Sequence, residues 1–195
     1  MARIGIFSGS FNPVHLGHIS FALQAIDSAK LDKVYFLPER RPRTKSVEHF
    51  AHRVAMINRA LKPHPKLKSL ELTDMAFSVD TTLTKLQTLF KDDQLVFLFG
   101  SDSVRQLNNW PKVDRLLKSA ELVIGIRREH NKAEVVSTIN RWPQQPRQLV
   151  IIEAWAGQVS STRVRQALRH HYYADGLLSS VASYSNKNWL YVSFI

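Results

Sequence analysis

Residues 4–18 read IGIFSGSFNPVHLGH, and this stretch decides the fold. The apolar run 4–7 predicts a buried strand, and apolar residues then recur along one face of a helix over 19–26. Small residues, a proline-fixed turn and two histidines, His15 and His18, lie at the junction. Backbone N–H groups at a helix start point outward, and the helix dipole favours an anion there. The sequence therefore predicts a phosphate-binding junction between a strand and a helix.

The composition limits the class of protein. The chain has 195 residues, so we expect one α/β domain over 1–195 with a helical tail over about 174–195 packed on it. It contains no cysteine, which excludes disulfides and thiolate metal sites. No apolar run reaches the roughly 18–20 residues of a transmembrane helix. Polar residues interrupt the first apolar run too early for a signal peptide, so a cytoplasmic location is expected.

The charge balance is strongly basic. The formal net charge is +11 and the isoelectric point is about 10.1. Such a balance favours anionic partners, namely nucleotides, nucleic acid or an acidic membrane surface. A solvated basic surface that only aids solubility explains it equally well. The charge suits a phosphate-rich substrate but does not identify one.

Strands and helices are predicted to alternate along the chain. The predicted strands are 3–7, 33–37, 70–72, 95–99, 122–126 and 149–152. The predicted helices are 17–29, 50–61, 81–90 with Asp80 as its N-cap, 104–110, 113–117, 133–140, 160–168 and 178–184. Such alternation is typical of an α/β fold with one doubly wound, Rossmann-like parallel sheet and helices on both faces. The most apolar run, 95–99, is expected at the centre of the sheet. Ligands of such folds bind beyond the carboxyl ends of the strands, where the strand order reverses.

Two motifs carry the chemistry. The chain has no G-x-x-x-x-G-K-[ST] loop and no G-x-G-x-x-G after the first strand. Residues 9–18 instead resemble the nucleotidyltransferase signature, in which H-x-G-H opens the helix after the first strand. Residues 159–165, VSSTRVR, resemble the late I-S-S-T-x-I-R motif of the same superfamily. Histidines or Ser-Ser-Thr at one helix start are often only caps, but the pairing of both motifs implies the nucleotidyltransferase type of this fold.

The intervening segments are similar to those of the nicotinate-nucleotide (nicotinate mononucleotide) adenylyltransferase family. Four segments carry this resemblance: 77–81 (FSVDT, like Y-T-V-D-T), 98–110 (like L-L-G-x-D…L-x-x-W), the basic loop 38–45, and the H-R pair at 52–53. The resemblance extends from Ile4 to about Tyr191 and is weakest over 127–150.

The resemblance implies transfer of AMP from ATP to nicotinate mononucleotide, which gives deamido-NAD and pyrophosphate in NAD biosynthesis. The mononucleotide 5′-phosphate attacks the α-phosphorus in line, so catalysis consists of positioning and charge stabilisation. The implied catalytic residues are His15 and His18, which donate to the β/γ- and α-phosphates, and Arg165, which donates to the leaving pyrophosphate. The other implied ATP-binding residues are Gly9, Ser10, Phe11, Gly100, Asp102, Arg127, Ser161 and Thr162. The implied cofactor is Mg²⁺, held mainly by ATP oxygens, and no metal ligand is assigned in the chain.

The acceptor side is implied by a second group of residues. Lys45 is implied for the acceptor phosphate, Ser78 and Thr81 for the pyridine carboxylate, and Trp110 as a stacking face. Asp102 is implied for a ribose hydroxyl or a metal-bound water. From the residues alone, the basic loop is equally well a solvated surface, and Trp110 equally well a core residue.

Departures from the family pattern leave alternatives open. Ser10 and Asn12 replace Thr and Asp of the usual G-G-T-F-D-P opening, and residues 111–113 (PKV) stand where a second aromatic commonly helps to hold the pyridine ring. The same chemistry on nicotinamide mononucleotide or phosphopantetheine is the alternative. A non-catalytic, basic nucleic-acid-binding protein is a distant alternative, favoured only by the net charge. We expect small-molecule substrates as partners, no membrane and no nucleic acid; the sequence leaves the oligomeric state open.

Overall fold

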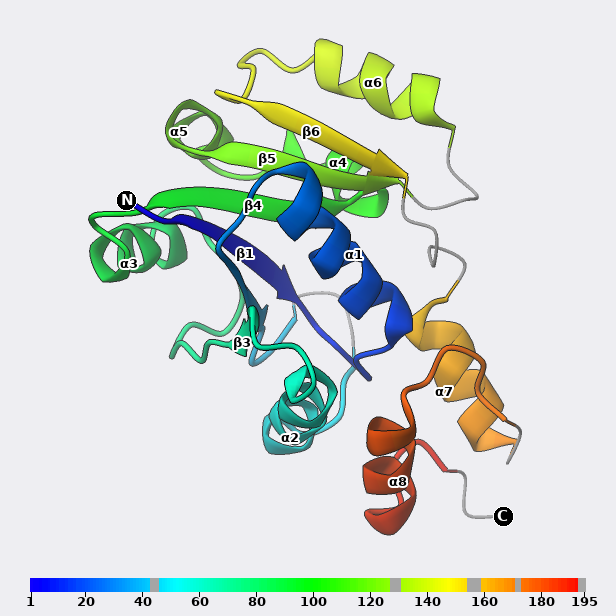
Figure 1. Ribbon diagram of the computed structural model, residues 1–195. Coiled ribbons are helices and arrows are strands. Elements are labelled where there is room, and N and C mark those ends of the chain that lie inside the picture. Colours follow the sequence, from blue (N-terminus) through cyan, green and yellow to red (C-terminus); the bar gives the residue numbers. More distant parts are fainter. Residues whose placement is uncertain (43–45, 127–130, 154–158, 171–172, 193–195) are drawn as a thin grey trace.

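The computed structural model describes residues 1–42, 46–126, 131–153, 159–170 and 173–192. Within these residues, six parallel strands form one sheet in the order β3-β2-β1-β4-β5-β6 (Figure 1). The strands are β1 (Arg3–Gly9), β2 (Lys33–Pro38), β3 (Leu67–Ser69), β4 (Gln94–Gly100), β5 (Glu121–Ile126) and β6 (Leu149–Glu153). The order reverses between β1 and β4, and this confirms the predicted doubly wound sheet.

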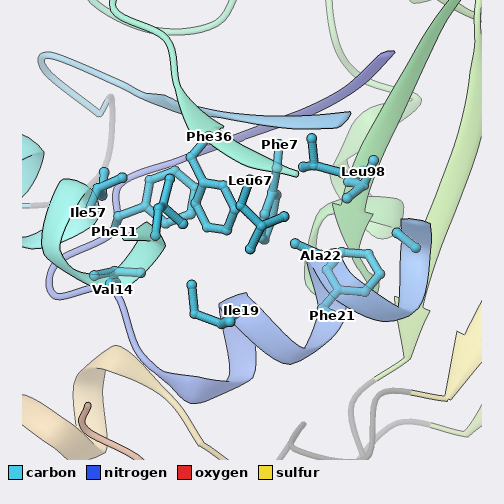
Figure 2. Close-up of a cluster of buried hydrophobic side chains, with 14 of the residues drawn as sticks. Phe7, Phe11, Val14, Ile19, Phe21, Ala22, Phe36, Ile57, Leu67 and Leu98 are labelled. Carbon is cyan, nitrogen blue, oxygen red and sulfur yellow. The ribbon is translucent and has the colours of Figure 1, made fainter. Parts of the chain in front are cut away.

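Alternating side chains of the strands feed two apolar clusters, one on each face of the sheet. Phe7 and Phe36 belong to the cluster beneath α1 and α2, and Figure 2 shows their rings among its other side chains. Ile6 and Phe97 belong to the opposite cluster. The strand β4 is buried from Leu95 to Phe99, and it pairs with β1 and β5. The predicted central position of this apolar run is confirmed.

The described residues contain eight helices (Figure 1). They are α1 (Leu16–Ser28), α2 (Phe50–Leu61), α3 (Thr82–Leu89), α4 (Ser101–Leu107), α5 (Val113–Ser119), α6 (Lys132–Asn140), α7 (Ser161–Arg169) and α8 (Ser179–Lys187). Of these, α7 and α8 lie beyond the sheet and do not cover its faces (Figure 1). Helix α8 packs against α2, where a ring nitrogen of His52 lies 3.0 Å from the Tyr184 hydroxyl. Arg59 also lies over the Tyr184 ring, 4.2 Å from its centroid.

The structure corrects two local predictions. The third strand is Leu67–Ser69 and not 70–72, because Val34 of β2 pairs with Leu67, whose side chain is buried. Asp80 is not the N-cap of α3; that position belongs to Thr81. The Asp80 carboxylate instead accepts a 2.6 Å hydrogen bond from the Lys112 ammonium. Tertiary pairing therefore overrides the local pattern at both places.

Across the described ranges, no helix combines the length and the apolar character needed to span a bilayer.

Candidate active site

The two signature histidines form one unit at the start of α1. His15 is the N-cap, and its backbone N–H donates to Nδ1 of His18 at 3.2 Å. Because this nitrogen accepts, the ring proton of His18 belongs on Nε2, which makes that atom a donor. The two rings stack with centroids 3.7 Å apart. The next backbone N–H, that of Leu16, donates to the Gly176 carbonyl at 2.9 Å. The orientation of His18 is thus fixed by the helix start itself.

The second motif docks directly on this junction. The side chain of Ser160, the N-cap of α7, accepts from the backbone N–H of Arg163 at 3.2 Å. The hydroxyl of Ser161 donates to the Pro13 carbonyl at 2.9 Å. Arg165 donates to the Asn12 carbonyl at 2.7 Å and to the Thr162 hydroxyl at 3.3 Å. The structure therefore brings the two motifs together, although these Ser161 and Arg165 donors bond to protein atoms.

A buried hydrogen-bond network supports the loop from behind. The Asn12 side-chain oxygen accepts from the Tyr191 hydroxyl at 2.8 Å and from the Glu48 backbone N–H at 3.2 Å. Burial raises the pKa of the Tyr191 hydroxyl and the charge of Glu48 raises it further, against the opposing charges of Arg165 and Arg53. Tyr191 therefore remains a neutral donor to Asn12 at physiological pH.

Arg53 of α2 ties three chain segments together. Its side chain is 0% exposed, and it donates to the carbonyls of Ser10 at 2.7 Å, Glu48 at 2.9 Å and Arg40 at 3.0 Å. Burial lowers the pKa of this guanidinium from its usual value, and the ionised form of Tyr191 and the charge of Glu39 oppose that shift. Arg53 thus holds the turn after β1 and the loop after β2 at fixed positions.

Two cavities in the described part of the chain meet at the carboxyl ends of β1 and β4. The first, of about 200 Å³, contains both signature histidines and is called the histidine cavity. The second, of about 550 Å³, contains Trp110 and is called the tryptophan cavity. Their shared wall consists of Ser8, Gly9, Ser10, Phe99, Asp102 and Ser103. Two ligands bound here would meet at the strand-order reversal, where such folds bind nucleotides.

The predicted site residues divide between these cavities and their surroundings. Gly9, Ser10 and Asp102 line both cavities. The histidine cavity adds Phe11, His15, His18 and Gly100, and the tryptophan cavity adds Ser78 and Trp110. The predicted residues that line neither cavity are Thr81, Ser161, Thr162 and Arg165. Lys45 and Arg127 lie outside the described residues.

Aromatic and charged contacts shape the tryptophan cavity. The half-buried ring of Trp110 lies 5.7 Å from the Phe77 ring and 5.7 Å from the Phe99 ring, centroid to centroid. At the rim, Asp80 bonds to Lys112, as described above, and so joins the segment before α3 to the segment before α5. Thr81 does not line this cavity. Burial acts to raise the pKa of the Asp74 carboxylate, but hydrogen bonds from Lys85 and Thr81 outweigh it and lower the pKa overall. Trp110 is therefore both a packed residue and a cavity wall.

Sequence reasoning missed three residues of this region as site residues. Ser8 lies on the wall shared by both cavities, and its position directly after the predicted strand is a signal that could have found it. Arg53 and Tyr191 support the loop from 43 and 179 positions away in the chain, respectively. Local sequence patterns contain no signal for these two long-range bonds.

Within the described ranges, no group of three or more His, Asp or Glu side chains could hold a metal ion. Asp102 contributes an exposed carboxylate to the shared wall. Among these residues, no set of side chains forms a cage that could coordinate a metal ion directly.

The sheet order and the helix start at its reversal define a Rossmann-like, nucleotide-binding α/β protein. A model of the cytidylyltransferase-like family matches residues 6–167. The chain belongs to this family and, within it, to the nicotinate-nucleotide adenylyltransferases, which are nucleotidyltransferases.

Relatives match nearly the whole chain. It is 32% identical to the nicotinate-nucleotide adenylyltransferase of Bacillus subtilis, over 99% of this chain and 100% of that protein. It is 32% identical to the probable nicotinate-nucleotide adenylyltransferase of Carboxydothermus hydrogenoformans, over 97% of this chain and 98% of that protein. Among solved structures, the Plasmodium falciparum nicotinic acid mononucleotide adenylyltransferase complexed with NaAD has a TM-score of 0.81 at 18% identity, covering 98% of each chain. This last likeness confirms the fold.

Proposed function

We propose that the chain transfers AMP from ATP to nicotinate mononucleotide, giving deamido-NAD and pyrophosphate. The family membership and the names of the relatives support this reaction. The observation that carries it is the shared wall of the two cavities, because adenylyl transfer needs two nucleotides whose phosphates meet at one point. The turn Gly9–Ser10 lies at that point.

The reaction requires positioning more than acid–base chemistry. An ionised acceptor phosphate is already a nucleophile, so no side chain has to remove a proton before the in-line attack on the α-phosphorus. The Nε2–H of His18 is the donor that we assign to the α-phosphate, with His15 beside it for the β- and γ-phosphates. Donors fixed before the reaction stabilise the developing negative charge without further reorganisation. The hydrogen bond from His15 N–H to His18 supports this role.

Arg165, Ser161 and Thr162 are proposed as the second side of the triphosphate site. Their position on α7, bonded to the loop between Gly9 and His18, supports this assignment. Arg165 has five N–H donors, so its bonds to Asn12 and Thr162 leave capacity for pyrophosphate oxygens.

Mg²⁺ is proposed as the cofactor, carried into the site by the triphosphate. The donor set fits this role, since the described residues offer no cage of carboxylates and Asp102 lies on the shared wall where it could reach a metal-bound water. Mg²⁺ usually keeps several waters and binds through substrate phosphates. When bound, the ion neutralises charge on the departing pyrophosphate.

The acceptor is assigned to the tryptophan cavity. Trp110 would stack on the pyridine ring, and Ser78 would bond to its carboxylate, with Lys45 and Thr81 kept as weaker candidates. The second candidate reaction is the same transfer to nicotinamide mononucleotide, favoured by one observation. Residue 111 is a proline, so the wall next to Trp110 lacks both a second aromatic and a backbone N–H at that position.

An acceptor panel tests the proposal. Purified chain, ATP and Mg²⁺ are combined separately with nicotinate mononucleotide, nicotinamide mononucleotide and phosphopantetheine, and pyrophosphate release is followed with mass identification of the adenylylated product. We expect deamido-NAD as the most efficiently formed product. Release with phosphopantetheine alone, or tight oligonucleotide binding without release from any acceptor, would refute the proposed function.

A further inference from the structure

The tryptophan cavity presents acidic side chains to a substrate that is itself an anion. Its described lining includes the carboxylates of Glu39, Asp80 and Asp102, and no lysine, arginine or histidine. A nicotinate mononucleotide carries both a phosphate and a ring carboxylate. Bringing these charges beside three carboxylates is unfavourable unless a cation compensates for them.

Glu39 and Asp80 each accept a hydrogen bond from a neighbouring part of the protein. Glu39 accepts from the backbone N–H of Phe77 at 3.2 Å. Asp80 accepts from the ammonium of Lys112 at 2.6 Å. The ammonium is therefore bonded directly to a residue of the cavity wall, and Lys112 follows the lining residue Pro111 in the chain.

The backbone at this wall makes Lys112 more important for binding an anion. Proline has no N–H, so position 111 cannot bind an anion through its backbone. Lys112 has a positive φ of 59° and precedes α5, and its side chain remains 61% exposed. An ammonium has three N–H donors, and Asp80 uses one of them. Two donors therefore remain on an ammonium that is bonded to Asp80, a residue of the cavity wall.

We propose that Lys112, oriented by Asp80, determines the preference of the tryptophan cavity for an acceptor ring that carries a carboxylate over one that carries an amide. This inference rests on the proposed function, because it requires a pyridine mononucleotide in this cavity. Asp80 acts as a positioning residue, since its carboxylate holds the ammonium at the rim without contacting the acceptor. The ammonium thereby supplies N–H donors that Pro111 does not provide.

The test compares the efficiency, kcat/KM, for nicotinate mononucleotide with that for nicotinamide mononucleotide. In Lys112→Met the acid-to-amide ratio should fall about fivefold, a size typical of one exposed charge interaction. Lys112→Arg should retain the ratio, and the KM for ATP should stay unchanged in both variants. The loss in Lys112→Met should shrink in high salt, because salt screens exposed charges.

A matched control lies on the helix that Lys112 precedes. Lys118 of α5 is 63% exposed and pairs with Asp114 at 3.8 Å, away from the cavity. Lys118→Met removes the same charge, so its acid-to-amide ratio should equal that of the unmodified chain. An equal fall in both variants would assign the effect to net charge and overturn the inference.

The outcomes separate this inference from the proposed function. If the unmodified chain uses nicotinate mononucleotide and Lys112→Met keeps its acid-to-amide ratio, the inference fails and the proposed function stands. If the unmodified chain uses neither pyridine mononucleotide, both fail. Asp80→Asn keeps an acceptor for Lys112 and removes a repelling charge, so its ratio should equal or exceed that of the unmodified chain. A fivefold fall in Asp80→Asn without a fall in Lys112→Met would contradict the role of Lys112.

Discussion

The two cavities are built by different kinds of interaction. Behind the histidine cavity, buried hydrogen bonds from Arg53 and Tyr191 fix the loop between Gly9 and His18. Around the tryptophan cavity, ring contacts of Trp110 and an exposed Asp80–Lys112 pair connect the walls. Buried polar contacts are costly to break, whereas exposed ion pairs contribute little to stability.

This difference separates the histidine cavity, which we propose for the reaction, from the tryptophan cavity, which we propose for acceptor specificity. The phosphate end must hold its donors in one geometry, because catalysis by fixed donors depends on small displacements. The acceptor end discriminates by rim contacts that single substitutions can change without unfolding the chain. Mutations in the two regions should therefore affect different measured quantities.

The largest effect is expected from Arg53→Met. Three carbonyls lose a charged donor, at about 1–3 kcal/mol for each unsatisfied group, so the free energy of unfolding should fall by about 3 kcal/mol or more. Urea denaturation measures the change. Arg59→Met is the control on the same helix, where the exposed arginine lies over Tyr184 and its loss should cost about 1 kcal/mol or less. Equal losses in the two variants would show that the buried network does not hold the loop.

The next effect should appear mainly in turnover, with a smaller loss of stability from the lost helix cap. His18→Ala removes the Nε2 donor, and kcat should fall about 100- to 1000-fold, as for the loss of one fixed donor to a developing anion. Steady-state kinetics and thermal unfolding of the same sample provide the measurement. His18→Asn keeps an acceptor near the Nδ1 position but is too short to replace Nε2, so its kcat should also be low. Normal turnover in either variant would show that His18 takes no part in the reaction.

A smaller effect is expected at the acceptor wall. Trp110→Leu removes the flat ring beside Phe77 and Phe99, and the KM for nicotinate mononucleotide should rise about tenfold, consistent with about 1.5 kcal/mol for an aromatic pair. The KM for ATP should stay constant. Trp189→Leu, at an exposed position that lines neither cavity, serves as the control. An equal rise in both KM values would mean that Trp110 supports the whole site and not only the acceptor.

The smallest effect concerns Tyr191. Tyr191→Phe loses one hydrogen bond to Asn12, so the free energy of unfolding should fall by about 1 kcal/mol near pH 7.

The same tyrosine also gives the stability a pH dependence. Because burial raises the pKa of Tyr191, the native state keeps this proton above pH ~10, where the unfolded chain loses it. The contribution is therefore complete below that pH and is lost as the pH rises further. Chemical denaturation between pH 9 and 11 on Tyr191→Phe should show a shallower alkaline loss than the unmodified chain or the exposed control Tyr173→Phe.

Contiguous patterns allowed much of the fold to be predicted. Local apolar runs predicted five of the strands, namely β1, β2, β4, β5 and β6. These segments are apolar because other parts of the protein cover both of their faces or their pairing edges. The strand β3 was misplaced because it has only three residues, and its position depends on pairing with β2. Local pattern is informative where burial is continuous along a segment.

The candidate site likewise contains one part that the local sequence predicts and another part that it does not. The turn from Gly9 to His18 could be identified because its residues are adjacent in the sequence. The bonds from Arg53 to Ser10 and from Tyr191 to Asn12 could not, since they depend on how distant elements pack. Thr81 was expected in the acceptor cavity, but it does not line that cavity, and its side chain interacts with the Asp74 carboxylate. Residue type and spacing do not determine to which of several nearby polar groups a hydroxyl will bond.

The carbonyl of Gly176 and the hydroxyl of Tyr191 complete a turn that is encoded in the first twenty residues. Gly176 has a φ of +73°, and a Cβ there would lie 2.5 Å from Val159, so other residues are poorly suited to this position. A growing polypeptide emerges from the ribosome with its N-terminal end first. The phosphate-binding turn is therefore among the first parts synthesised and among the last to acquire its full set of contacts. A nascent chain that ends before Gly176 already contains every strand of the sheet and both signatures, but not a finished site.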